Sequence, residues 1–127
     1  MTAASDYLEN KLLAHTFSNT AYTSPSTVYV ALYTVAPTDS TTGTEVTGGG
    51  YVRQSASFTT TASDTTNASA IEWPTATADY GTVVAVAVLD ASSSGNMLAF
   101  AALDTNKTIS TGDVFRVPSG DLDITLN

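Results

Sequence analysis

The sequence predicts a mainly β, single-domain protein: an antiparallel β-sandwich or barrel-like fold with one N-terminal α-helix. Three observations support this prediction. The chain has 127 residues, enough for one domain to bury its own core without disulfides. Charged residues make up only 13% of it, while the abundant threonine, valine and tyrosine favour strands. Seven or eight short apolar segments then follow one another at near-regular spacing, with turn residues between them, as in sandwiches and barrels.

The helix is predicted from about Asp6 to Phe17. Ser5 is a suitable N-cap, and Asp6 and Glu9 place negative charge in the first turn, where it stabilises the helix dipole. Apolar side chains recur at helical spacing, namely Leu8, Leu12, Leu13 and Phe17. The segment ends before the polar stretch at residues 18–26, which we interpret as a linker.

This linker divides the chain. We expect residues 1–25 to be an N-terminal helical arm and linker, and residues 26–127 to be the β-sandwich domain. Leu8, Leu12 and Phe17 give the arm an apolar stripe, which suits docking on a partner protein. The alternative is that the helix covers an edge of the β-sandwich of the same chain, which would also require an apolar stripe.

The first strand is predicted from Thr27, where the apolar pattern changes to period two. Alternate residues as far as Tyr33 are apolar on both sides, so we expect both faces of this strand to be covered. Residues 36–39 close the strand. The polar segment Ser40 to Gly50 is predicted to be a loop, and a loop of this length is suited to reaching a neighbouring subunit.

Three consecutive glycines, Gly48 to Gly50, end that loop. A phosphate-binding loop needs a lysine and a hydroxyl residue after its glycines and a helix behind them. Tyr51, Val52 and Arg53 follow instead, and no helical pattern comes next. We therefore interpret the glycines as the turn into a second strand, Tyr51 to Thr59.

The remaining chain alternates short strands and turns. The valines of Thr82 to Leu89 indicate a central strand, and the small polar residues 90–96 are typical of a hairpin loop. Proline cannot donate to a sheet ladder and so ends the short strand at Ile71 to Pro74. The other predicted segments are a loop or weak strand extension at Thr60–Asn67, and strands at Met97–Leu103, Lys107–Ser110, Val114–Pro118 and Leu122–Leu126.

The charge of the chain argues against nucleic acid as a partner. Its formal net charge is -8, with twelve acidic residues against four lysines and arginines, and no basic stripe is present to attract phosphates. The N-terminus lacks the basic and apolar regions of a signal peptide, and no segment is long and apolar enough to span a bilayer. We therefore expect a protein made in a cytoplasm, with no membrane partner.

The residue types needed for catalysis or metal binding are scarce. Cysteine is absent and His15 is the only histidine, so we expect no enzyme, no cofactor and no metal. Asp121 and Asp123 alternate on a predicted strand and share a face, but calcium-loop spacing is missing and solvated carboxylates are the simpler interpretation. Trp73 and the six tyrosines suit either a ligand-stacking surface or core packing, and core packing is the commoner use.

Seven sequence blocks occur in a characteristic order along nearly the whole chain: Tyr7–His15, Pro25–Tyr33, Gly43–Gln54, Ile71–Pro74, Ala78–Gly81, Gly95–Leu98 and Gly112–Pro118. In these blocks the chain resembles a family of small tailed-bacteriophage virion proteins. The resemblance implies a structural protein without catalytic residues, since similar proteins are labelled tail fibre proteins or act as capsid cement. It also implies that the glycine block is a structural signature, with Tyr51 and Arg53 as sheet or contact residues.

From this resemblance we expect a capsid cement or decoration protein on the outer surface of the phage head. Its partner would be the major capsid protein, and it would be a homo-oligomer or be present in many copies on the icosahedral head. The alternative is a tail-fibre or receptor-binding component. The predicted interface residues are Leu8, Leu12, His15, Phe17, Glu45, Tyr51 and Arg53.

Overall fold

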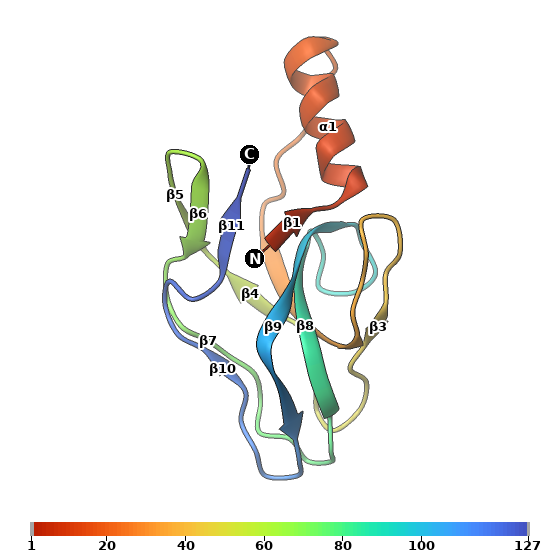
Figure 1. The fold of residues 1–127 in the computed structure, drawn as a ribbon, viewed down its shortest axis with the longest axis vertical. Coiled ribbons are helices and arrows are strands. Elements are labelled where there is room, and N and C mark those ends of the chain that lie inside the picture. Colours follow the sequence, from red (N-terminus) through yellow and green to blue (C-terminus); the bar gives the residue numbers. More distant parts are fainter. Residues whose placement is uncertain (1, 127) are drawn as a thin grey trace.

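A computed structural model describes residues 2–126 and has the predicted mainly β, sandwich-like architecture. Its larger layer is a six-stranded antiparallel sheet in the order β1-β9-β8-β2-β3, with β4 beside β2 (Figure 1). The strands of this main sheet are β1 (Thr2–Ala4), β2 (Val28–Val35), β3 (Thr44–Glu45), β4 (Gln54–Ala56), β8 (Gly81–Leu89) and β9 (Met97–Ile109).

The second layer consists of two smaller antiparallel sheets. One pairs β10 (Arg116–Val117) with β7 (Ile71–Glu72), and the other has the order β11-β6-β5, from Asp123–Thr125, Asp64–Asn67 and Phe58–Thr61. The main core lies between the layers and joins residues of both: its largest members include Trp73, Leu32, Val30 and Val83, all at most 1% exposed.

The predicted covering of both faces of the first strand is confirmed. Val30 and Leu32 belong to the main core, whereas Ala31 and Tyr33 belong to a second apolar cluster on the opposite face of the sheet. The central position of β8 is confirmed as well, because it pairs with both β2 and β9 and its residues 85–89 are buried. Each large aliphatic side chain buried there contributes about 1.5–3 kcal/mol.

The helix α1 spans Asp6–Phe17, as predicted, and the chain enters it from β1. The Ser5 hydroxyl caps it by accepting from the Leu8 N–H at 3.2 Å. The same hydroxyl donates to the Met97 carbonyl at 2.5 Å, and the Ser5 N–H donates to the Leu98 carbonyl at 2.9 Å. These bonds fix the root of the helix to β9, while the rest of the helix projects from the β-body (Figure 1).

The predicted division at residue 25 remains a prediction, and β1 complicates it. Thr2 to Ala4 pair with Ala101 to Ala99 of β9 and therefore form part of the main sheet. No strand was predicted here, because the short Thr-Ala-Ala segment has no strong strand propensity. The segment is a strand because its backbone pairs with the edge of β9.

Two predicted strands, Met97–Leu103 and Lys107–Ser110, are in fact one continuous strand, β9. The polar residues 104–106 suggested a turn. They instead form part of an irregularity: Ala102 pairs with Ala85, and Lys107 is the next residue that pairs, with Val83. The extra residues bulge from the ladder without ending the strand.

The predicted second strand, Tyr51–Thr59, is also wrong in part. Residues 51–53 lie outside any strand, and Ser57 separates β4, which pairs with β2, from β5, which pairs with β6. Residues 60–67 complete the β5–β6 hairpin, so the weak strand extension is the correct reading of that segment. The predicted loop Ser40–Gly50 contains the short strand β3.

Elsewhere the predicted C-terminal strands are shorter than expected. Of Val114–Pro118 only Arg116 and Val117 are in a strand, and of Leu122–Leu126 only residues 123–125. Within residues 2–126, α1 is the single helix, and it is too short to cross a membrane.

Candidate interaction surfaces

Three of the predicted interface residues meet in one hydrogen-bonded cluster, which we call the Arg53 clamp: Glu45, Tyr51 and Arg53. The Arg53 guanidinium binds the Glu45 carboxylate in a bidentate manner, at 2.9 Å from Nε to Oε2 and 2.8 Å from Nη2 to Oε1. The Tyr51 hydroxyl donates to Glu45 Oε2 at 2.7 Å and accepts from the Leu32 N–H at 3.0 Å. The clamp thus connects β3 with the middle of β2.

The remaining nitrogen of the guanidinium, Arg53 Nη1, connects the clamp to the β8–β9 hairpin loop. It donates to the Ala91 carbonyl at 2.9 Å and to the Ser94 carbonyl at 2.8 Å. The Arg53 side chain is only 9% exposed, and that of Glu45 is 24% exposed. Their polar groups therefore form hydrogen bonds within the chain. A partner protein would contact mainly the exposed part of the Glu45 side chain.

The glycine block positions this clamp. Gly48, Gly49 and Gly50 all have positive φ, at 79°, 62° and 78°, which glycine adopts without strain. A Cβ on Gly49 would also lie 2.6 Å from the Ala78 carbonyl oxygen. The Tyr51 N–H closes the turn on Gly48. The predicted turn is confirmed, although β4 begins only at Gln54.

The clamp holds its members in fixed protonation states. Burial alone would raise the pKa of the Glu45 carboxyl, but the hydrogen bonds from Arg53 and Tyr51 and the Arg53 charge outweigh it and hold this pKa below its ordinary value. Burial, followed by the bond to Glu45, raises the pKa of the Tyr51 hydroxyl far above its ordinary value. At neutral pH the cluster is therefore a carboxylate, a neutral phenol and a guanidinium.

The lowered pKa of Glu45 predicts a pH dependence of stability. In the unfolded chain this carboxyl titrates near 4.5, so below that pH the unfolded state binds more protons than the folded state. The stabilisation by Glu45 is thus complete at neutral pH and is lost as the pH falls through the folded-state pKa. Glu45→Gln should be less stable than the native chain at pH 7, and the difference should narrow at about pH 3. Urea unfolding across this range measures it, and two parallel stability profiles would contradict the prediction.

The other predicted interface residues lie on α1 and are not equivalent. Leu8, in the first turn of the helix, and Leu12, one turn further along, are half-buried. His15 is exposed, and its Nδ1 accepts from the Tyr22 N–H at 3.2 Å, which fastens the linker to the helix. Phe17 is 80% exposed. Leu13, which was not among the predicted interface residues, is 59% exposed and lies one turn before Phe17. The distal half of the arm thus carries an exposed apolar pair, Leu13 and Phe17.

The tryptophan and several tyrosines do not form an open stacking surface. Trp73 is 1% exposed and packs against Phe115, with ring centroids 5.4 Å apart. Tyr33 and Tyr80 are 3% and 4% exposed. These aromatic rings belong to the interior, which is the core-packing alternative considered from the sequence.

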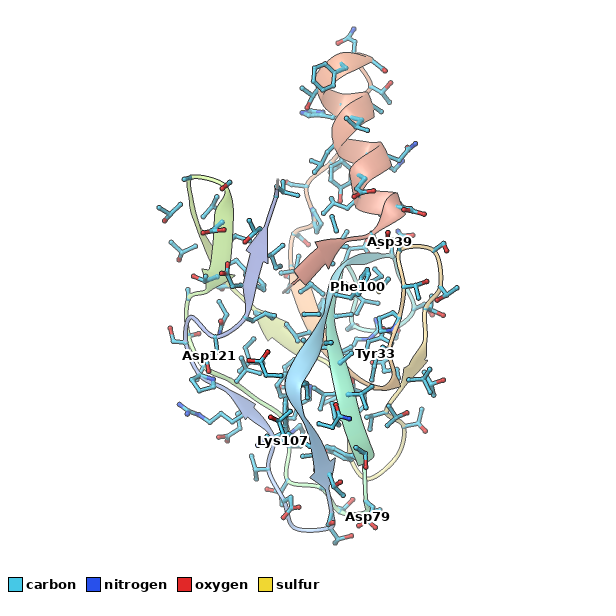
Figure 2. The ribbon with its side chains drawn as sticks, in the orientation of Figure 1. Tyr33, Asp39, Asp79, Phe100, Lys107 and Asp121 are labelled. Atoms are coloured by element: carbon cyan, nitrogen blue, oxygen red, sulfur yellow. The ribbon has the colours of Figure 1, made fainter. Side chains whose placement is uncertain are left out.

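A groove that the sequence did not reveal lies between β9 and the segment that carries β10 and β11. Its volume is about 520 Å³, and Asp121 and Asp123 line it together with Asp104, Lys107 and Arg116. Figure 2 shows that Lys107 comes from β9 and Asp121 from the turn before β11. Among residues 2–126, no three histidine, aspartate or glutamate side chains gather as a metal site.

Comparison with known families gives one match that spans the whole fold. A family model described as "Podophage GP4 fiber I protein gp80" matches residues 3–125, which include α1, the clamp and both layers. No curated protein matches the chain.

Proposed function

Because the chain belongs to the family described as podophage GP4 fiber I protein gp80, we propose that it is a non-enzymatic structural component of a phage fibre. The match over residues 3–125 carries this proposal. It favours the tail-fibre alternative over the capsid cement role expected from the sequence, since the family description names a fibre. Its partners would then be other fibre or tail proteins rather than the major capsid protein.

The arm suits the attachment of such a component. None of the residues of α1 is buried, so the helix contributes little to the core. Leu13 and Phe17 lie four positions apart and so occupy one face of the helix. Burying two such exposed apolar side chains favours association. We propose that this distal face docks on a neighbouring fibre or tail protein.

The location of the protein in the virion tests the proposal. Antibody labelling of purified particles, read by electron microscopy together with the copy number per particle, separates the two roles. Label on fibres with few copies is expected. Label spread over the head with tens to hundreds of copies would contradict the fibre role and support the cement expectation.

The arm can be tested with matched variants. Leu13→Ser with Phe17→Ser should weaken attachment to the particle by about tenfold or more. The free energy of unfolding should change by less than about 1 kcal/mol, because both side chains are exposed. Val52→Ser with Val114→Ser removes two other exposed apolar side chains, 56% and 46% exposed, and serves as the control. Attachment is measured by adding each protein to particles that lack it. Equal loss in both double variants would contradict a specific role of the arm.

A further inference from the structure

Two strand edges that have no partner strand within residues 2–126 border the groove between β9 and the β10–β11 segment. The strand β1 covers the outer edge of β9 only at Ala99 to Ala101. From Ala102 to Ile109 no strand within residues 2–126 pairs with this edge. Strand β10 pairs only with β7, so its other edge has no partner strand within residues 2–126. Unpaired edges of this kind present backbone N–H and C=O groups that readily accept another strand.

The floor of the groove is apolar and continuous with the core. Val86, Leu103, Phe115 and Leu122 line it, and Phe115 packs on the buried Trp73. The groove is thus the place where the two layers of the sandwich fail to close. An extended segment that binds in the groove would cover this floor. It would also pair with the edge of β9 beyond the residues that β1 pairs with.

The rim of the groove is charged, with an excess of acid. It carries Asp104 and Asp121 against Lys107, because Arg116, which also lines the groove, has its Nε 4.0 Å from the Glu72 carboxylate on the neighbouring strand. The chain as a whole has a net charge of -8. A second copy would bring the same excess of negative charge, so electrostatics favours a basic occupant.

We propose that this groove accepts an extended, basic polypeptide segment of a neighbouring protein by strand addition to β9. The segment alternates apolar side chains, which face Leu103, Phe115 and Leu122, with lysines or arginines, which reach the rim. Backbone hydrogen bonds to the β9 edge supply affinity, and the alternation supplies specificity. As a contact with a neighbouring virion protein, the site rests on the proposed fibre function, but strand binding itself can be measured on the isolated chain.

The first experiment uses a synthetic peptide of about eight residues that alternates valine and lysine, a typical strand length. The peptide is titrated into the isotopically labelled protein and followed by NMR. Saturable shifts are expected for amides of residues 102–107, 116–117 and 123–125, together with slower hydrogen exchange along the outer edge of β9. Shifts centred on any other surface would overturn the proposal.

Two controls separate strand addition from general attraction to an acidic protein. A peptide of the same charge with proline in place of alternate valines lacks the backbone donors and should not bind. Asp104→Asn with Asp121→Asn should weaken binding about fivefold. Asp39→Asn with Glu9→Gln removes the same charge from residues at or near the base of α1, away from the groove (Figure 2), and should leave binding unchanged.

Equal binding of the proline peptide, or equal weakening by both double variants, would mean that charge alone attracts the peptide and would overturn the proposal. These outcomes leave the fibre function intact, because that function is decided by the location in the virion. Conversely, labelling of the head would refute the fibre function without affecting strand binding.

Discussion

Replacing Trp73 with alanine is expected to destabilise the protein by about 3–5 kcal/mol. The ring is the largest side chain among those that are fully buried, and it packs against Phe115, so that the residue directly after β7 contacts the residue directly before β10. Its removal leaves a cavity that a sheet with fixed register cannot close. Because domains of this size are stable by about 5–15 kcal/mol in total, the variant should be partly unfolded at moderate temperature. Since Trp73 is the only tryptophan, unfolding is followed by far-UV circular dichroism in urea rather than by fluorescence.

The matched variant Trp73→Phe separates ring packing from the indole N–H. That N–H is buried and has no hydrogen-bond partner among residues 2–126, so its loss removes an unsatisfied donor as well as some volume. The phenylalanine variant should therefore lose much less stability than the alanine variant. Equal losses would contradict this expectation and would show that a phenyl ring recovers none of the stability that the indole supplies.

Replacing Arg53 with alanine should cost about 2–4 kcal/mol, somewhat less than a fully buried ion pair because Glu45 remains 24% exposed. The change leaves the Glu45 carboxylate with Tyr51 as its only side-chain donor. It also removes the donor from the Ala91 and Ser94 carbonyls. Arg53→Lys should recover only part of the loss, because an ammonium cannot reproduce the planar fork of the guanidinium.

An exposed ion pair, between Arg116 and Glu72, provides the control for Arg53. Arg116 and Glu72 are 4.0 Å apart, with side chains 55% and 63% exposed, so Arg116→Ala should cost less than about 1 kcal/mol. Urea unfolding of both alanine variants at neutral pH gives the comparison. A loss at Arg53 no larger than that at Arg116 would contradict the structural importance of the clamp.

The features that were predicted correctly depend on local chemistry. The helix could be placed because its cap at Ser5, its acidic first turn and its apolar spacing all lie within residues 5–17. The strands β2 and β8 could be placed because their apolar residues follow the pleat of a buried sheet. In each case residues that are close together in the sequence are enough to predict the element.

The features that were missed depend on distant backbone. The short strand β1 exists because the edge of β9 receives it, at a sequence distance that no local pattern reports. The hydrogen bonds of Arg53 to the Ala91 and Ser94 carbonyls could not be predicted, because every residue has a backbone carbonyl and only the fold brings these two to Arg53. The interface role of Arg53 stays a prediction. The groove likewise depends on where strands stop, and strand ends are the least predictable part of a pattern.

The double role of Ser5 determines the order in which the molecule is completed during synthesis. Its hydroxyl caps α1 and also bonds to the carbonyl of Met97, and its N–H bonds to Leu98. A helix of 12 residues is marginal in water when it is isolated. The ribosome makes the arm before it makes residues 97–101, to which β1 and Ser5 are hydrogen-bonded. The arm therefore acquires its anchored form only after the strands that precede residue 97 and the first half of β9 have been made.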